Sequence, residues 1–309
     1  PQMQLLNVAG TVEIARPAVV SIVAEARIRR VYGDIYSVFG NGTGVIFDLQ
    51  GLVLTNTHVV DRATTITVTM DDGSQEKATV IGADPMSDLA VLQLPGSDYP
   101  HLPLTSGAAP RVGDWVIAIG NALALPGGPT VTVGVVSALG RSLDVSPEIT
   151  LYDLIQTDTV MYPGFSGGPL IDAAGRVLGL NTSAILRGLS LTVPTPTIQR
   201  IVETILAHGR VRRGYLGVGA QPTPLPEKLA QELGQETGLL LVSVEPGSPA
   251  ERGGMFLGDT IVALAGQPVR RLDDLLAGLG GEQIGKQVPI RIVRGGQLQE
   301  ITVTLEEHS

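Results

Sequence analysis

Short runs of β-branched and other apolar residues, separated by turns rich in Gly, Asp and Asn, recur from residue 18 to residue 181. Runs of this kind, each bounded by turn residues, are typical of antiparallel β-sheet proteins. The predicted strands cover 18–23, 44–47, 53–54, 65–70, 77–81, 114–120, 130–137, 154–157, 170–171 and 177–181. About a dozen strands at this spacing predict one or two β-barrels.

Two Gly-containing segments within this part are predicted to be turns. Asp71-Asp72-Gly73 separates two strands as a hairpin turn and lacks the acidic spacing of a calcium loop. Gly40-Asn41-Gly42-Thr43-Gly44 precedes a strand rather than a helix and lacks the Lys of a phosphate-binding loop. We therefore interpret it as a turn before a barrel strand and exclude nucleotide binding.

A helical period replaces the strand pattern after residue 195. Apolar residues recur at i, i+3, i+4, i+7 and i+8, behind a predicted Thr195 cap and Pro196 at the first helical position, and Gly209 ends the helix. Arg210 to Arg213 is the predicted linker, and new strands begin at Gly214. Because 309 residues exceed what one core usually organises, we expect two domains, 1–209 and 210–309.

Composition excludes several functional classes. The net charge of −9 and the pI near 4.9 argue against nucleic-acid binding, which needs a basic face. The absence of cysteine excludes disulfides, thiolate catalysis and Cys-based zinc sites. We expect no metal and no cofactor, and protein or peptide partners.

The chain contains four histidines, so few residues are candidates for histidine-dependent chemistry. His58 follows an apolar strand and a group of small polar residues that are suited to hold an imidazole at a barrel edge. His101 lies in a proline-flanked loop, His208 ends the predicted helix, and His308 lies in the tail, where solvated side chains are common.

A carboxylate and a serine complete a candidate catalytic set. Asp88 lies at the mouth of an apolar strand, where a partly buried carboxylate needs a donor such as an imidazole N–H; Asp84 and Asp158 are the competing carboxylates. Ser166 lies in Gly164-Phe165-Ser166-Gly167-Gly168-Pro169, whose glycines allow backbone amides to converge as an oxyanion hole requires. The natural donors are the amides of Gly164 and Ser166.

Two catalytic classes share the Gly-x-Ser-x-Gly motif, and chain order separates them. In α/β-hydrolases the serine precedes the acid and the histidine, and a helix follows the serine. Here a strand and a turn follow Ser166, and the order His58, Asp88, Ser166 matches the chymotrypsin arrangement. The sequence therefore favours a chymotrypsin-like double β-barrel.

Several blocks resemble the HtrA (Deg) family of serine proteases over nearly the whole chain. Residues 42–46 with 54–60 resemble its histidine block, 87–92 its aspartate block, and 156–158 with 164–170 its serine block. Residues 116–121 and 132–137 are also similar to family segments. The family usually carries Asn where this chain has Tyr162 and Phe165.

The resemblance implies a catalytic triad of His58, Asp88 and Ser166 and an oxyanion hole within Gly164, Phe165 and Ser166. It also implies an S1 pocket lined by Met161, Ala184 and Ile185, all uncharged, which favours cleavage after small or medium aliphatic residues. The alternative for Ala184 and Ile185 is ordinary barrel packing.

The C-terminal part resembles a PDZ domain. Tyr215, Leu216, Gly217 and Val218 are similar to its carboxylate-binding loop, and 245–250 with 257–261 are similar to its later core motifs. The resemblance implies that a peptide C-terminus binds the loop and adds as a strand beside a helix near 271–279. A PDZ-like fold with an unused groove is the alternative.

As a whole, the resemblance implies a trimeric endopeptidase of protein quality control that cleaves unfolded or misfolded proteins. The alternative is a catalytically impaired chaperone or pseudoprotease that acts through its PDZ domain and peptide binding. The first loop, Arg27 to Phe39, is short, which favours a plain homotrimer over a large cage. We expect an extracytoplasmic location, periplasmic or secreted, with membrane anchoring through a segment before Pro1 as a further possibility.

Overall fold

The computed structural model describes residues 7–29, 35–104, 109–121, 128–146, 149–182 and 189–307. The chain divides into two compact units, 1–211 and 212–309. The sequence placed this division between 209 and 210. Each unit has a hydrophobic core of its own.

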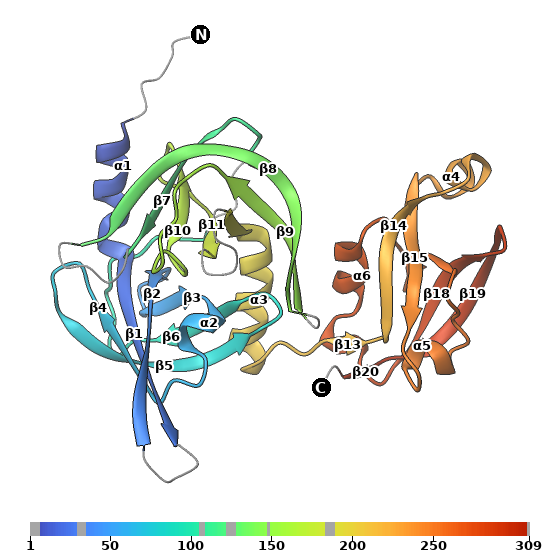
Figure 1. Cartoon of the computed structure of the whole chain (residues 1–309), viewed down its shortest axis with the longest axis horizontal. Helices are drawn as coiled ribbons and strands as arrows, with labels where there is room; N and C mark the ends of the chain where they lie inside the picture. Colours follow the sequence, from blue (N-terminus) through green and yellow to red (C-terminus); the bar gives the residue numbers. More distant parts are fainter. Residues whose placement is uncertain are drawn as a thin grey trace. The chain divides into compact units, whose positions relative to one another are not determined.

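Unit 1 begins with a short helix and a closed six-stranded barrel, in the order β1-β2-β3-β6-β5-β4 (Figure 1). All neighbouring strands in it are antiparallel. The elements are α1 (Val8–Ala15), η1 (Arg16–Ala18), β1 (Val19–Arg29), β2 (Ile35–Ile46), β3 (Leu52–Thr55), α2 (Thr57–Val60), β4 (Thr65–Thr69), β5 (Gln75–Asp84) and β6 (Leu89–Gln93).

A second closed barrel follows, in the order β10-β11-β12-β9-β8-β7. Its strands are β7 (Trp115–Gly120), β8 (Thr130–Ser146), β9 (Ile149–Thr157), β10 (Pro169–Asp172), β11 (Val177–Thr182) and β12 (Ser190–Pro194). The predicted double β-barrel is thereby confirmed. Strand β8 extends past the predicted 130–137 to Ser146, and β9 begins at Ile149 rather than at the predicted Leu154.

The two barrels share one hydrophobic core with the helix that ends the unit, α3 (Thr195–His208). Leu54 and Leu89 reach this core from the first barrel, Ile117 and Ile119 reach it from the second, and Ile201 comes from α3. Burial of apolar surface is the main favourable term in folding. The shared core therefore holds the two barrels together, while each barrel also encloses a buried cluster of its own.

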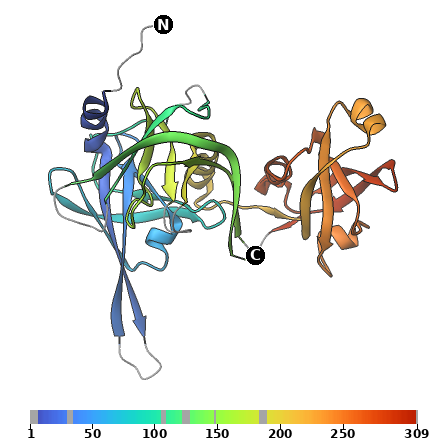
Figure 2. The ribbon, with the colours of Figure 1, turned by 45° about the horizontal axis from the view of Figure 1, so that its top comes forward.

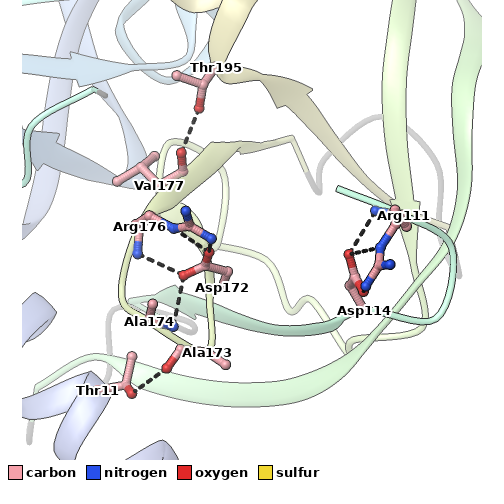
Figure 3. A network of polar contacts seen from close by, with 9 residues as sticks. All are labelled: Thr11, Arg111, Asp114, Asp172, Ala173, Ala174, Arg176, Val177 and Thr195. Carbon is pink, nitrogen blue, oxygen red and sulfur yellow. Dashed lines mark hydrogen bonds and ion pairs between the residues drawn. The ribbon is translucent and has the colours of Figure 1, made fainter. Parts of the chain in front are cut away.

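The start of α3 differs from its prediction. Thr195 is the first residue of the helix, Pro194 is the capping residue without a side-chain bond, and the Thr195 hydroxyl donates to the Val177 carbonyl at 2.8 Å (Figure 3). Thr195 therefore ties the helix to β11 and is not a cap. The predicted stop is confirmed, since Gly209 has a left-handed backbone and its N–H donates to Ile205.

The hairpin of β1 and β2 differs from two of the sequence-based predictions. Strand pairing runs from Val19 and Val45 out to Arg29 and Ile35, so most of the expected loop 27–39 is paired strand. The paired ends extend beyond the barrel wall in both views (Figures 1 and 2). The Gly-rich segment 40–44 also lies within β2 and is not a turn.

Unit 2 is built around a sheet in the order β14-β15-β16-β18-β19, with β17 paired to β16 and a separate β13-β20 pair. Its elements are β13 (Gly214–Tyr215), β14 (Val218–Pro224), α4 (Glu227–Leu233), β15 (Thr237–Val244), α5 (Pro249–Arg252), β16 (Thr260–Leu264), β17 (Gln267–Pro268), α6 (Leu272–Gly278), η3 (Gly281–Gln283), β18 (Gln287–Arg294), β19 (Gln297–Thr304) and β20 (Glu306–Glu307). Helix α6 lies next to β14, as the sequence predicted for a peptide groove.

Candidate active site

His58 and Asp88 meet at one edge of the first barrel. β3 and β6 pair so that Thr55 faces Ala90, which brings α2, just after β3, next to the turn that precedes β6. His58 Nδ1 lies 2.9 Å from Asp88 Oδ1 and 2.8 Å from Oδ2, and the His58 backbone N–H donates to Oδ1 at 3.1 Å. The Asp88 side chain is 9% exposed, and that of His58 is 34% exposed. The carboxylate is thus shielded while the imidazole keeps an open face.

The backbone of Asp88 is held in an uncommon conformation. Its φ is +54°, in the left-handed region that Asp tolerates better than most residues. The Asn56 amide donates to its carbonyl at 2.8 Å, the Thr57 N–H donates to the same oxygen at 3.2 Å, and the Thr57 hydroxyl donates to the Leu89 carbonyl at 2.8 Å. The polar residues before His58 therefore hold the aspartate's backbone, whereas the sequence suggested that they hold the imidazole.

Thr182, at the end of β11, contributes a contact that sequence reasoning missed. Its hydroxyl donates to Asp88 Oδ2 at 3.0 Å, so a residue of the second barrel supports the carboxylate of the first. The two competing carboxylates are used elsewhere. Asp84 accepts from the Ser87 hydroxyl, and Asp158 accepts from the Val135 amide at 2.6 Å.

Ser166 lies in a buried turn just before β10 and is 3% exposed. Gly164 and Gly167, on either side of it, have φ of +101° and +87°, which a residue with a Cβ rarely adopts. The Gly167 N–H donates to the Asn181 carbonyl, and the Ser166 carbonyl accepts from the Thr43 N–H at 2.8 Å. Backbone bonds to both barrels therefore fix the turn.

Phe165 packs inward from this turn. Its ring is fully buried among residues of the second barrel, and it lies against Gly120, where an added Cβ would be 2.7 Å from Phe165 Cα and 2.8 Å from Cγ. Tyr162, 45% exposed, contacts it with the ring centroids 6.1 Å apart. The Phe165 amide donates to the Tyr162 carbonyl at 3.0 Å. Of the three residues expected to form an oxyanion hole, Phe165 thus commits its amide to the turn, leaving Gly164 and Ser166 as candidates.

A common neighbour places Ser166 close to α2. A Cβ added to Gly42 would lie 2.6 Å from a Val59 methyl carbon and 3.2 Å from the Ser166 carbonyl oxygen. The residue after His58 and the nucleophile candidate therefore approach the same point beside β2. With Nδ1 as donor to the carboxylate, Nε2 of the neutral imidazole is the acceptor and can take a hydroxyl proton.

The remaining predicted residues are placed as follows. Met161 is partly buried and packs against the cluster that contains Phe165, while Ala184, Ile185 and His308 lie outside the described residues. His208 ends α3, and His101 is exposed with Nδ1 3.3 Å from the Tyr99 carbonyl.

The loop that precedes β14 in unit 2 presents backbone amides. The Leu216 carbonyl accepts from the Ala250 N–H and the Gly217 carbonyl accepts from the Glu245 N–H, each at 2.9 Å. Because C=O and N–H point in opposite directions across a trans peptide, the Gly217 and Val218 amides face away from 245–250. Hydrogen bonding to Glu245, together with burial, raises the pKa of Tyr215 to about 12.

Known proteins share both units. The model of the trypsin-like peptidase domain matches residues 42–180, and that of the PDZ domain matches 214–305. Fold and motifs thus define a trypsin-like peptidase unit followed by a PDZ domain. The "HtrA-type protease AlgW with tripeptide" is 32% identical, with 97% of each chain covered and a TM-score of 0.80. The chain belongs to the HtrA family of serine proteases.

Curated relatives agree with this assignment. A "Probable periplasmic serine endoprotease DegP-like" of Chlamydia muridarum is 38% identical over 272 residues, which are 86% of this chain and 54% of the relative. The "Putative serine protease HhoB" of Synechocystis sp. is 38% identical over 278 residues, 85% of this chain and 66% of the relative. The chain thus spans about half to two-thirds of the length of these relatives. Among the described residues, none of the helices has the length and apolar character needed to cross a membrane.

Proposed function

We propose that the chain is a serine endopeptidase of HtrA type that cleaves unfolded or misfolded proteins. The observation that carries the proposal is the contact of His58 Nδ1 with both carboxylate oxygens of Asp88, supported by the Thr182 hydroxyl. A shielded carboxylate that accepts a hydrogen bond from Nδ1 keeps the proton on that nitrogen. Nε2 is then the unprotonated nitrogen and can act as a base. Family membership and the nearby Ser166 turn support the same activity.

In the proposed mechanism, Ser166 Oγ attacks the carbonyl carbon of the scissile peptide bond while His58 Nε2 takes its proton. Asp88 stabilises the imidazolium that forms, and the amides of Gly164 and Ser166 stabilise the oxyanion of the tetrahedral intermediate. His58 then returns the proton to the leaving amine, and an acyl-enzyme forms on Ser166. Water, activated by the same imidazole, hydrolyses this ester.

A covalent probe and a protein substrate test this proposal together. The full chain is treated with a fluorophosphonate and, separately, incubated with unfolded casein, with Ser166→Ala as the matched control. We expect labelling at Ser166 and casein cleavage that the variant lacks. Wild-type protein that neither labels nor cleaves faster than Ser166→Ala would refute the proposal.

The competing function, a pseudoprotease that acts by binding alone, is motivated by Phe165 beside the nucleophile. It predicts that Ser166→Ala retains full function. The burial of the Phe165 ring against Gly120 weighs against it, because the ring is accommodated in the barrel core and leaves the turn intact. Holdase activity on casein without cleavage would favour it.

For the PDZ unit we propose binding of a peptide C-terminus by the loop of Tyr215, Leu216, Gly217 and Val218. The inferred direction of the Gly217 and Val218 amides supports carboxylate binding. Solved structures of the similar HtrA-type protease AlgW are described as being with a decapeptide or a tripeptide. Fluorescence anisotropy with a C-terminal peptide, free or amidated, tests the loop, since amidation removes the charge that it would bind. Equal affinity for both peptides would exclude it.

Location, assembly and S1 specificity complete the proposal. We propose an extracytoplasmic location on the basis of relatives named periplasmic. We also propose that the protein forms a homotrimer, and light scattering coupled to gel filtration tests this assembly.

We also propose an uncharged S1 pocket with Met161, Ala184 and Ile185. Mapping of casein cleavage products tests this pocket, for which cleavage mainly after Lys or Arg is the contrary result.

A further inference from the structure

Thr43 lies in β2 and is fully buried. Its hydroxyl donates to the Gly164 carbonyl at 2.6 Å and accepts from the Asn121 N–H at 2.8 Å. A hydroxyl has one proton to donate, and here that proton is given to the turn that contains Ser166. The same oxygen accepts from the residue that directly follows β7.

The backbone of Thr43 bonds to the same region. Its N–H donates to the Ser166 carbonyl at 2.8 Å, and its own carbonyl accepts from the Thr55 hydroxyl at 2.8 Å. Gly167 passes directly over it, since a Cβ at Gly167 would lie 2.0 Å from the Thr43 carbonyl oxygen. Thr43 thus contacts the residues on both sides of Phe165.

These bonds fix the plane of one peptide in the turn. The Gly164 carbonyl and the Phe165 N–H belong to the same planar unit, and the two ends bond to Thr43 and Tyr162 respectively. Gly164 has φ of +101°, and glycine changes its backbone angles at low cost. This peptide lies between the two that carry the Gly164 N–H and the Ser166 N–H, so what holds its plane sets the path of the chain between the two candidate donors.

We infer that Thr43 is a positioning residue for the nucleophile turn: its hydroxyl holds the Gly164–Phe165 peptide, between the two candidate donor amides, and couples the turn to the segment after β7. Thr43 belongs to the first barrel, whereas Gly164 and Asn121 follow strands of the second. The residue therefore also aligns Ser166 with His58 across the two barrels. The inference rests on the proposed peptidase function.

Removal of the hydroxyl tests the inference in the full-length chain. Thr43→Val keeps the shape and removes the hydroxyl, Thr43→Ser keeps the hydroxyl, and Thr195→Val removes a buried hydroxyl bond of similar length away from the turn. We expect Thr43→Val to lower kcat on a casein-derived peptide about ten- to a hundredfold with KM within twofold, because loss of an oxyanion donor itself costs about 100- to 1,000-fold. Thr43→Ser should recover most of kcat, and Thr195→Val should leave it unchanged.

Hydrogen exchange supplies a readout that does not need activity. In Thr43→Val we expect faster exchange in peptides covering 115–121 and 162–168, with exchange elsewhere unchanged. Wild-type exchange in both segments, or a wild-type kcat in a folded Thr43→Val, overturns the inference. If the wild-type protein is no more active than Ser166→Ala, the proposed peptidase function is contradicted. The hydrogen-exchange measurement then tests the positioning role of Thr43 independently of activity. Thr43→Ala replaces Thr43→Val in both measurements if the latter does not fold.

Discussion

Thr182 donates its hydroxyl to Asp88 Oδ2 at 3.0 Å, the same oxygen that lies 2.8 Å from His58 Nδ1. Thr182 is 2% exposed and comes from β11, on the barrel opposite to that of Asp88. The carboxylate is therefore held from both barrels, and its orientation toward the imidazole depends on their alignment.

Thr182→Val is expected to reduce peptidase activity while the protein stays folded. A hydrogen bond to a charged group contributes about 1.5–3 kcal/mol, which corresponds to a loss of roughly ten- to a hundredfold if the bond is needed to orient Asp88. Steady-state kinetics on a peptide substrate measure it, with Thr182→Ser as the control that retains the hydroxyl. An unchanged kcat in the valine variant would contradict a role in orientation.

Phe165→Ala is expected to lower the free energy of unfolding by about 3–5 kcal/mol, because it empties a fully buried ring site. Denaturant unfolding in a Ser166→Ala background, which prevents self-cleavage, measures the change. The matched control is Phe39→Ala, whose ring is 61% exposed. Comparable losses for the two variants would contradict the packing described for Phe165.

Gly120 and Phe165 should be energetically coupled. Gly120→Ala places a Cβ 2.8 Å from Phe165 Cγ, so part of its cost should disappear when the ring is absent. A double-mutant cycle with Phe165→Ala is expected to give a coupling energy of about 0.5–3 kcal/mol. Strictly additive costs would show that the ring is not what excludes a side chain at position 120.

Two glycines with similar backbone angles provide a further test. Gly167 and Gly175 have φ of +87° and +80°. An added Cβ would lie 2.0 Å from the Thr43 carbonyl oxygen at Gly167, whereas at Gly175 the nearest atom among the described residues is a Thr11 methyl carbon at 3.6 Å. Gly175→Ala should cost about 1–2 kcal/mol from backbone strain alone. Gly167→Ala should cost more than about 4 kcal/mol, because the added Cβ overlaps a backbone oxygen that cannot move aside. Thermal unfolding measures both costs. Equal costs would rule out the close approach of Thr43.

The pKa of the Tyr215 hydroxyl should lie above that of a free tyrosine side chain. Its hydrogen bond to Glu245 raises its pKa to about 12 in the folded protein, whereas the unfolded value is near 10. The folded state thus holds the proton more tightly, so this stabilisation is complete below about pH 10 and is lost as pH rises through about 12. The difference in tyrosinate absorbance between wild type and Tyr215→Phe isolates this group. Glu245→Gln should move the midpoint down, and a wild-type midpoint near 10 would contradict the bond.

The sequence was sufficient for the fold class and for the order of the candidate residues. Strand runs with turn residues predicted barrels, and the positions of His58 and Asp88 before Ser166 separated two hydrolase classes. Family blocks located the PDZ domain. These features depend on local pattern and order along the chain, which a sequence displays directly.

Other features depend on contacts between distant segments, so they could not be predicted. Gly40 to Gly44 suggested a turn, yet the segment lies in β2, where Gly42 leaves room for Val59 and the Ser166 carbonyl. Thr182 reaches Asp88 only because β11 ends next to the first barrel, and nothing in its neighbours along the chain indicates this. Thr195 resembled a cap, but it bonds to Val177 on an adjacent strand.

The division of the candidate site between two barrels has a consequence for biosynthesis. His58 and Asp88 belong to the first barrel, while Ser166 precedes β10 of the second. A chain leaving the ribosome presents its N-terminal part first, so the histidine and aspartate emerge before the serine exists. With the proposed triad, the peptidase unit stays inactive until β12 closes the second barrel, so a chain that stops before this strand cannot cleave the proteins around it.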